Sequence, residues 1–184
     1  MSDYEEKVLA SERVYEGRII NLRVDSVQLP DGKTGTREVV EYTGAVAIVP
    51  LNDQGEIFLV RQYRYAVGKT LLEIPAGKLE PGEDPETSAG RELLEETGYK
   101  ASKLTRLISF FSTPGFTTEK LHLFLANGLS LKQQNLDHDE FIDVVKVSFE
   151  RALEMIWTGE ICDAKSVAGI LAVQSLKKRE REAI

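Results

Sequence analysis

The sequence has little of several features that mark particular classes of protein. Cys162 is the only cysteine, so no disulfide can form within the chain, which fits a reducing compartment such as the cytoplasm. No apolar run approaches the length of a membrane span, since AVAIVPL is about the longest. The acidic start MSDYEEK is not typical of a secretory signal. We therefore expect a cytoplasmic protein that does not associate with a membrane.

Positive charge is also scarce. The 30 acidic residues outnumber the 23 basic ones, which gives a net charge of −7. No stripe of Lys and Arg with interleaved aromatic residues occurs, so a nucleic-acid polymer is not an expected partner. An acidic protein can still bind a phosphorylated small molecule if it holds metal cations. The 184 residues, 42% of them hydrophobic, suffice for one globular domain with its own core.

Turn signals and hydrophobic patterns divide the chain into short strands and a few helices. Residues 19–29 and 37–42 around PDGKTG predict a first hairpin, and residues 45–51 and 56–64 around NDQG predict a second. An isolated hairpin is only marginally stable in water, so the first must pack on something. We expect further strands at 71–75, 104–112, 119–127 and 143–149, and helices at 150–157 and 163–179. Because strands and helices do not alternate strictly, the order predicts a mixed sheet between helices.

The stretch AGKLEPGEDPETSAGRELLEETGY (76–99) predicts one further helix with clear ends. Asp84 is a suitable N-cap, Pro85 suits the first helical position, and Gly98 is a typical C-terminal stop. The helix should therefore span about 85–97. Residues Leu93 and Leu94 can face a core.

The polar face of this helix carries an unusual number of like charges. Glu92 and Glu96 are four residues apart and lie one above the other, and Glu95 lies beside them. Arg91 is the one nearby cation and can bond Glu95. One interpretation is a solvated acidic helix face. The other is a site for a hard divalent cation, since Mg²⁺ typically takes one or two carboxylates together with waters and substrate phosphates.

The residues around the glutamates favour the second interpretation. Gly77, five residues, Glu83, seven residues and then RELLEETGY (91–99) resemble the signature of the Nudix hydrolases, G-x5-E-x7-R-E-U-x-E-E-x-G-U, where U is bulky and apolar. The resemblance implies an α/β fold, an α/β/α sandwich around a mixed sheet, with an added N-terminal antiparallel β subdomain. It also implies a loop–helix–loop that binds Mg²⁺, or Mn²⁺ as a substitute, and hydrolyses a nucleoside diphosphate linked to another moiety.

Other parts of the chain resemble the ADP-ribose pyrophosphatase branch of that family. These parts are the N-terminal hairpin, REVVEYTGAVAIVPL, QYRY, the loop around Pro114 and the late acidic loop. They imply hydrolysis of ADP-ribose to AMP and ribose 5-phosphate by a homodimer. In that arrangement residues 1–42 form a subdomain swapped to the partner, and residues 43–184 form the Nudix domain. The alternatives are a hydrolase of another nucleotide sugar, such as GDP-mannose or ADP-glucose, and a non-catalytic ADP-ribose sensor.

The same resemblance implies roles for individual residues. Its metal ligands are the carbonyl of Ala76 and the carboxylates of Glu92, Glu95, Glu96 and Glu140. Its catalytic residues are Glu96 and Glu140, and the general base remains open among Glu140, Asp139 and His138. Its substrate contacts are Arg18, Ile19, Arg37, Glu38, Arg64, Lys78, Thr113 and Glu119. Arg18 and Ile19 stand where the branch often has an aromatic residue, so the adenine contact would be a guanidinium plane or an aliphatic wall. Taken without the resemblance, Arg37 and Arg64 could be solvated strand residues.

Overall fold

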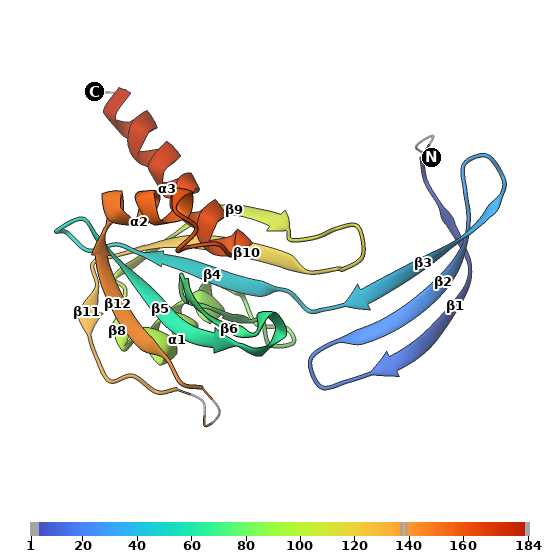
Figure 1. The fold of residues 1–184 in the computed structure, drawn as a ribbon, viewed down its shortest axis with the longest axis horizontal. Coiled ribbons are helices and arrows are strands. Elements are labelled where there is room, and N and C mark those ends of the chain that lie inside the picture. Colours follow the sequence, from blue (N-terminus) through green and yellow to red (C-terminus); the bar gives the residue numbers. More distant parts are fainter. Residues whose placement is uncertain (1–3, 137, 139, 183–184) are drawn as a thin grey trace. The chain divides into compact units, whose positions relative to one another are not determined.

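The computed structural model describes residues 4–136, 138 and 140–182 and divides the chain into two compact units (Figure 1). Unit 1 comprises Met1–Gly44 and Phe111–Lys120, and unit 2 comprises Ala45–Phe110 and Leu121–Ile184. The chain therefore passes from one unit to the other three times. No helix among the described residues is long and apolar enough to cross a membrane.

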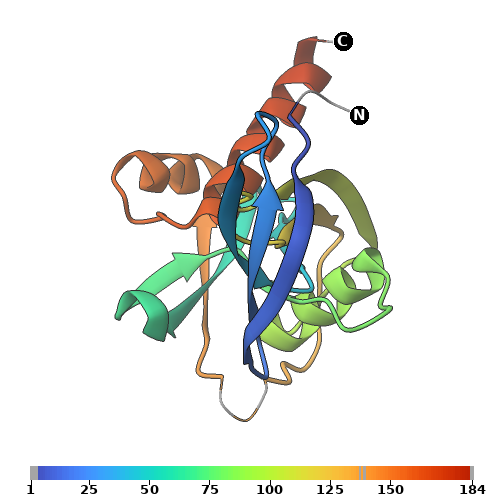
Figure 2. The same ribbon diagram turned by 90° about the vertical axis from the view of Figure 1, so that its right-hand side faces the viewer.

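Unit 1 is built around three antiparallel strands that lie side by side (Figure 2). They are, in sheet order, β1 (Lys7–Glu16), β2 (Asn21–Gln28) and β3 (Thr34–Glu41). The strands β2 and β3 form the first predicted hairpin. β1 was not predicted from the sequence, because all of its residues are exposed and its apolar and charged residues do not alternate.

The second segment of unit 1, residues 111–120, joins the sheet through hydrogen bonds to the end of β3. The Val40 N–H donates to the Phe116 carbonyl at 2.8 Å, and the Thr118 N–H donates to the Val40 carbonyl at 3.0 Å. The Thr118 hydroxyl accepts from the Tyr42 N–H at 2.9 Å and donates to the Tyr42 carbonyl at 3.1 Å. The loop around Pro114 is thus bonded to the N-terminal sheet.

Unit 2 contains the remaining elements. Its strands are β4 (Ala45–Pro50), β5 (Glu56–Arg64), β6 (Lys69–Glu73), β7 (Ala76–Lys78), β8 (Tyr99–Lys100), β9 (Lys103–Phe111), β10 (Lys120–Asn127), β11 (Ser130–Leu131) and β12 (Asp143–Ser148). Its helices are η1 (Tyr65–Val67, a 3-10 turn), α1 (Pro85–Thr97), α2 (Phe149–Trp157) and α3 (Ala164–Glu182). One sheet has the order β7-β4-β10-β9, a second has the order β12-β5-β6, and β11 pairs with β8.

The strand β4 is the centre of unit 2. It runs parallel to β10 and antiparallel to β7, and every one of its residues is buried. The helices α1 and α3 both pack against β4, and Figure 1 shows them on opposite sides of it. On the α1 side the buried cluster consists of Val46, Ile48, Leu79, Ala89, Leu93, Phe124 and Ala126. The expected α/β/α sandwich with a mixed sheet is therefore confirmed.

The second predicted hairpin is wrong, although both of its strands exist. The strands β4 and β5 follow each other through the Asn52–Gly55 turn, but a single bridge, Leu51 to Ile57, joins them. β4 then pairs with β7 and β10, whereas β5 pairs with β6 and β12. A strand that is buried on both faces is more typical of the middle of a mixed sheet than of a hairpin with one wet face.

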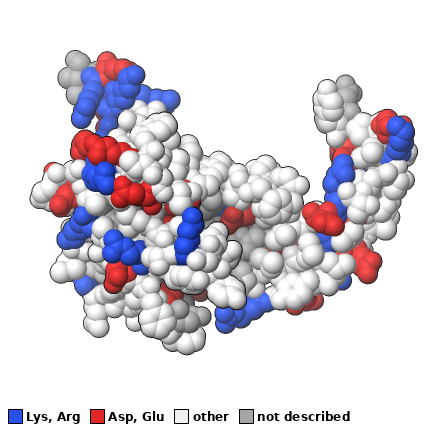
Figure 3. Space-filling model, in the orientation of Figure 1, with Lys and Arg blue, Asp and Glu red and all other residues white. Residues whose placement is uncertain are grey.

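The helix α3 approaches the sheet closely. A Cβ atom at Gly169 would lie 2.9 Å from Cδ1 of Ile74 and 3.0 Å from Cγ2 of Val49, so a larger residue would push the helix away. The buried Ser166 hydroxyl accepts a hydrogen bond from the Ile74 N–H at 2.8 Å. At the other end of α3, Lys and Arg side chains gather where the helix carbonyls carry partial negative charge (Figure 3).

The ends of α1 are those predicted from the sequence. The Asp84 carboxylate accepts hydrogen bonds from the N–H groups of Glu86 and Thr87, at 3.0 and 3.1 Å, and Pro85 is the first helical residue. At the other end Gly98 has a φ of 72°, and its N–H donates to the Leu94 carbonyl at 2.8 Å. Local capping chemistry therefore sets the length of the helix that carries the glutamates.

Asp84→Ala removes the acceptor for two backbone N–H groups and should destabilise the protein by about 1 kcal/mol, the usual value of an N-cap. For a chain of this size the expected loss in Tm is roughly 2 to 4 °C, measured by thermal denaturation. Asp84→Asn is the matched control, because an asparagine cap keeps the acceptor oxygen. Equal losses in the two variants would contradict the capping role.

Candidate active site

Glu96 is the most buried carboxylate of α1. Its side chain lies against the start of β7, where its Oε2 accepts a hydrogen bond from the Ala76 N–H at 2.9 Å. The residue is only 3% exposed, and this burial raises the pKa of Glu96 to about 8. The hydrogen bond from Ala76 acts in the opposite direction, but it does not offset the loss of water. The folded chain therefore keeps a carboxyl group where a negative charge is poorly stabilised.

Glu92, one turn earlier, lies against the backbone of β7. A Cβ atom at Gly77 would be 1.9 Å from the carboxyl carbon of Glu92, so glycine is required for this close approach. Burial raises the pKa of Glu92 to about 7, and the positive charge of Arg91 reduces that rise. Because Gly77 and Ala76 are adjacent, β7 touches both carboxylates with consecutive residues.

Arg91 is committed mainly to another glutamate. Its Nε and Nη2 bond the two carboxylate oxygens of Glu83, both at 3.0 Å, and this pairing lowers the pKa of Glu83 to about 2. Its Nη1 bonds Glu95 at 2.8 Å, as predicted, and lies 2.8 Å from Glu92. Arg91 thus ties the loop before α1 to the helix and orients Glu95. One guanidinium shared among three carboxylates leaves the patch with excess negative charge.

The loop after β11 is attached to the carboxyl end of α1. The Lys132 N–H donates to the Gly98 carbonyl at 2.7 Å and the Asn135 N–H donates to the Glu95 carbonyl at 3.2 Å, while the Gln134 side-chain amide donates to the Glu96 carbonyl. The same loop carries Glu140, which is partly buried.

Glu140 lies near enough to α1 for its charge to affect both candidate metal ligands. Burial is the main cause of the raised pKa of Glu92 and of Glu96, and the negative charge of Glu140 makes a smaller contribution to both. His138 is exposed, and Asp139, the other candidate base, lies outside the described residues. The structure therefore brings Glu140 and the α1 glutamates into one electrostatic cluster.

The chemistry of these donors fits a hard divalent cation. Within residues 4–136, 138 and 140–182, no group of three or more His, Cys, Asp or Glu side chains is arranged to hold a metal ion. The site offers two carboxylates, Glu92 and Glu96, and Mg²⁺ typically takes one or two from a protein. A cation beside them would also stabilise their ionised forms, which burial in the chain alone disfavours.

Two of the predicted substrate contacts lie in unit 2 with these carboxylates. Lys78 is the exposed last residue of β7. Arg64 ends β5 and forms two hydrogen bonds to Glu73, which is 1% exposed. Glu73 was not among the residues predicted from the sequence, although a single charged residue within the apolar strand LLEIP is a detectable signal.

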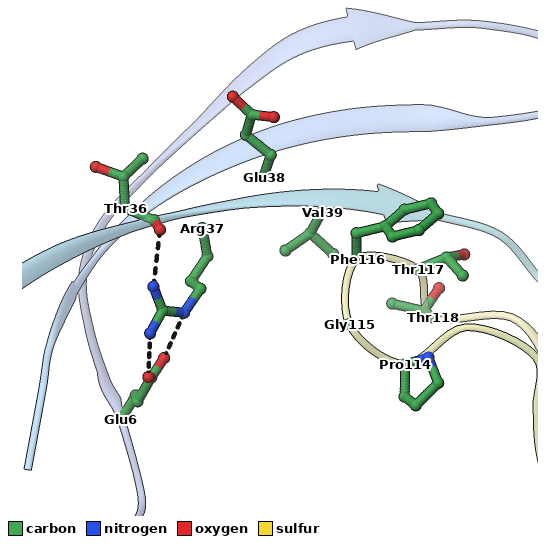
Figure 4. A pocket seen from close by; sticks show the side chains of 10 residues that line it. All are labelled: Glu6, Thr36, Arg37, Glu38, Val39, Pro114, Gly115, Phe116, Thr117 and Thr118. Atoms are coloured by element: carbon green, nitrogen blue, oxygen red, sulfur yellow. Dashed lines mark hydrogen bonds and ion pairs between the residues drawn. The ribbon is translucent and has the colours of Figure 1, made fainter.

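Arg37 lines a pocket of about 630 Å³ that lies wholly within unit 1 (Figure 4). Its Nε and Nη2 bond the carboxylate of Glu6, the first at 2.9 Å, and its Nη1 donates to the Thr36 carbonyl at 2.9 Å. Glu38 points away from Arg37, as neighbours on a strand do (Figure 4). The pocket is lined by Glu6, Thr36, Arg37, Glu38, Val39, Pro114, Gly115, Phe116, Thr117 and Thr118.

The other predicted substrate contacts also belong to unit 1. Arg18 and Ile19 are exposed in the turn between β1 and β2. The Thr113 carbonyl accepts from the N–H groups of Phe116 and Thr117, at 3.3 and 3.2 Å, and the Glu119 N–H donates to the Thr117 hydroxyl at 3.2 Å. The candidate residues thus form two sets. One set surrounds the α1 glutamates in unit 2, and the other surrounds the pocket and turns of unit 1.

Comparison with known proteins accounts for both units. A model described as NUDIX domain matches residues 41–168, and a model described as Nucleoside diphosphate sugar hydrolase N-terminal domain matches residues 6–40. An ADP-ribose pyrophosphatase of Bacillus subtilis (strain 168) is 46% identical over 182 residues, which cover 98% of this chain and 97% of that protein. A methanol dehydrogenase activator of Bacillus methanolicus is 45% identical over 96% of this chain and 95% of its own length.

A solved structure shares the fold. The crystal structure of an ADP compounds hydrolase has a TM-score of 0.86 and 24% sequence identity, and the match covers 96% of each chain. The region matched by the NUDIX domain model includes β7, α1 and Glu140, where the buried carboxylates lie. On the family match, the near full-length relatives and this geometry, the chain belongs to the Nudix hydrolase family.

Proposed function

We propose that the protein hydrolyses the pyrophosphate bond of ADP-ribose, giving AMP and ribose 5-phosphate, with Mg²⁺ as its cation and Mn²⁺ as a possible substitute. The observation that carries this proposal is the buried pair Glu92 and Glu96, whose charges Arg91 balances only in part. The Bacillus subtilis relative supports the substrate, since it is named an ADP-ribose pyrophosphatase and is similar over nearly the whole chain. The Bacillus methanolicus relative, which is almost as similar, is named a methanol dehydrogenase activator, so kinetics on ADP-ribose decide the substrate.

In this proposal Glu92, Glu96 and the Ala76 carbonyl hold the cation, and Arg91 keeps Glu95 beside them. When bound, Mg²⁺ supplies activation of the attacking water and neutralisation of phosphate charge. Glu140 accepts the proton of the water that attacks phosphorus, because its carboxylate lies in the same charge cluster. The Ala76 N–H fixes one oxygen of Glu96, so the orientation of this ligand is set before substrate binds.

The substrate contacts follow from the chemistry of the remaining residues. Arg64 and Arg37 suit the diphosphate, because a guanidinium can form two parallel hydrogen bonds to phosphate oxygens. Lys78 adds positive charge at the end of β7. We assign Glu38, Thr113 and Glu119 to the ribose hydroxyls, and Arg18 and Ile19 to the adenine.

We also propose that the protein is a homodimer in which residues 1–42 complete the partner's site. All ten residues of β1 are exposed in the single chain, and the apolar side chains of Val8, Leu9, Val14 and Tyr15 are 48–60% exposed. Apolar side chains this exposed on a short sheet favour burial against a second chain. The homodimer explains why candidate contacts are divided between the two units.

Steady-state kinetics with Mg²⁺ test the substrate. We expect kcat/KM to be higher for ADP-ribose than for ADP-glucose, GDP-mannose or NADH, because the residues that bind beyond the pyrophosphate distinguish these compounds. Identification of AMP and ribose 5-phosphate as products completes the measurement. Faster hydrolysis of any of the other three compounds would reject ADP-ribose while leaving metal-dependent hydrolysis in place.

Glu96→Gln is the control for these measurements. The substitution keeps the shape of the side chain and removes its charge, so turnover should fall by orders of magnitude. The folded structure should persist, because an amide oxygen can still accept from the Ala76 N–H. Near-normal Mg²⁺-dependent turnover in this variant would contradict the role of Glu96, and complete inactivity of the unaltered protein on ADP-ribose would reject the proposed function.

The raised pKa values predict how the stability of the metal-free protein depends on pH. Folding raises the pKa of Glu92 to about 7 and of Glu96 to about 8, so the folded chain holds protons that the unfolded chain has released. Stability should therefore fall as pH rises from about 5 to about 8. Each tenfold difference in proton affinity corresponds to about 1.4 kcal/mol, or roughly 3 to 6 °C in Tm.

Thermal denaturation in EDTA and in saturating Mg²⁺, at about pH 6 and about pH 8.5, measures this effect. Mg²⁺ should raise Tm more at the higher pH, because it binds ionised carboxylates. In EDTA, Glu96→Gln should lose less stability between the two pH values than the unaltered protein, since its side chain cannot ionise. The same pH dependence in both proteins would show that other groups cause it.

Light scattering at micromolar concentration tests the homodimer. We expect twice the chain mass of 20.6 kDa. Leu9→Arg, which places a charge on β1, should shift the protein towards the monomer and lower kcat/KM. Leu131→Arg is the matched control, since Leu131 is 70% exposed and lies in unit 2. A fully active monomer would contradict this proposal.

A further inference from the structure

A partly buried network of four charged side chains joins β5, β6 and the start of α3. Glu73 is at its centre and accepts from Arg64 Nε at 2.9 Å and from Arg64 Nη2 at 2.7 Å. Lys165 Nζ donates to the same carboxylate and, at 2.8 Å, to Asp163. Two positive and two negative charges make the network neutral. All four residues belong to unit 2.

The geometry fixes one edge of Arg64 and leaves the other available. Nε and Nη2 face Glu73, whereas Nη1 has no hydrogen-bond partner among the described residues. The Arg64 side chain is 39% exposed, although Glu73 is 1% exposed and Lys165 is 15% exposed. The network is therefore closed towards the interior and presents a guanidinium edge outward, which is the form in which arginine binds phosphate oxygens.

The network lies beside the candidate metal site. The hydrogen bonds that Arg64 donates to Glu73 raise the pKa of Arg64 most, and burial opposes them. The charges of Glu73, Glu96 and Asp163 raise this pKa further. Glu73 is also followed by Ile74, whose N–H is bonded to Ser166, and then by Pro75 and Ala76, whose N–H is bonded to Glu96. One short segment thus carries both the residue that holds Arg64 and the group that holds Glu96.

The start of α3 holds Lys165 in turn. Asp163 Oδ2 accepts from the Ser166 N–H at 3.2 Å and from Lys165 Nζ, so the residue that caps the helix also orients the lysine. Lys165 donates to Oε2 of Glu73, the same oxygen that accepts from Arg64 Nη2. Arg64 already bonds both oxygens of Glu73, so the two side chains could shift together, but the bond from Lys165 anchors the carboxylate to α3.

We infer that Lys165 is a positioning residue that acts through Glu73 to fix Arg64, so that the outer edge of Arg64 meets the diphosphate of the substrate. This role rests on the proposed function, in which Arg64 is a diphosphate ligand. Lys165 itself does not touch the substrate. Without the ammonium group of Lys165, Glu73 keeps Arg64 but loses its bond to α3, and the guanidinium edge is less well directed.

A purely structural role for the network predicts a different result. In that case loss of Lys165 lowers Tm and changes kinetics independently of Arg64. A positioning role predicts that the kinetic effect of Lys165 disappears once Arg64 is gone, because the two residues act on the substrate through one guanidinium. A double-mutant cycle separates these two explanations.

The experiment measures kcat and KM for ADP-ribose with Mg²⁺, and Tm, in Lys165→Met, Arg64→Ala and the double variant. Lys165→Met should raise KM roughly tenfold, the scale of one charge-assisted hydrogen bond, with kcat changed less than about twofold. In the Arg64→Ala background the same substitution should change KM by less than about twofold. Lys165→Arg, which keeps the charge and the donors, should restore most of the affinity.

Lys178→Met is the matched control, because Lys178 is on the same helix with a side chain that is 76% exposed. It should leave both constants unchanged. If Lys165→Met does not fold, Lys165→Gln takes its place in the cycle. Equal effects of the lysine substitution with and without Arg64, or no effect on KM at all, overturn the positioning role. Hydrolysis of ADP-ribose by the unaltered protein and its loss in Glu96→Gln would meanwhile leave the proposed function standing.

Discussion

The structure of unit 2 around α1 depends on two carboxylates that water does not fully solvate. Burial raises the pKa of Glu92 and Glu96, and the surrounding groups do not reverse this. Arg91, the nearest cation, is shared with Glu83 and Glu95, so it cannot neutralise the pair. An apolar side chain of similar size at these two positions would cost less energy to bury. The chain instead keeps two acids, and a ligand that brings positive charge would offset the cost of ionising them.

The backbone around the carboxylates is adapted to that constraint. The glycine at 77 allows Glu92 to touch β7, and the Ala76 N–H bonds Glu96. β7 is short, and the segment before it is held from the other side of the sheet by Ser166 of α3. The helix that supplies the carboxylates and the helix on the opposite side of β4 therefore both act on the same few residues. Rigid elements on both sides of a strand are a good support for ligands that must be placed accurately.

Local features were predictable from the sequence, and pairings across the chain were not. The bounds of α1 follow from Asp84, Pro85 and Gly98, which act on neighbouring residues, and the same stretch contains the glutamates. The partners of β4 could not be predicted, because an unbroken apolar run says nothing about which strand lies beside it. The bond between Lys165 and Glu73 spans 92 residues, and neither residue has a local pattern that indicates the other. The resemblance to a family supplied the candidate contacts and a division at residue 42, but only the structure places Thr113 and Glu119 in the N-terminal unit.

The composition of unit 1 also bears on the order in which the chain folds as it is synthesised. The strands β1 to β3 emerge first, but residues 111–120 complete the unit, and Tyr42 and Thr118 are 76 residues apart. At a synthesis rate of about 5 to 20 residues per second, several seconds pass between the synthesis of β3 and the synthesis of that segment. During this interval its exposed apolar side chains and unpaired strand edges have no native partner from the same chain. The ribosome therefore presents a sheet whose stability depends on contacts that have not yet been made.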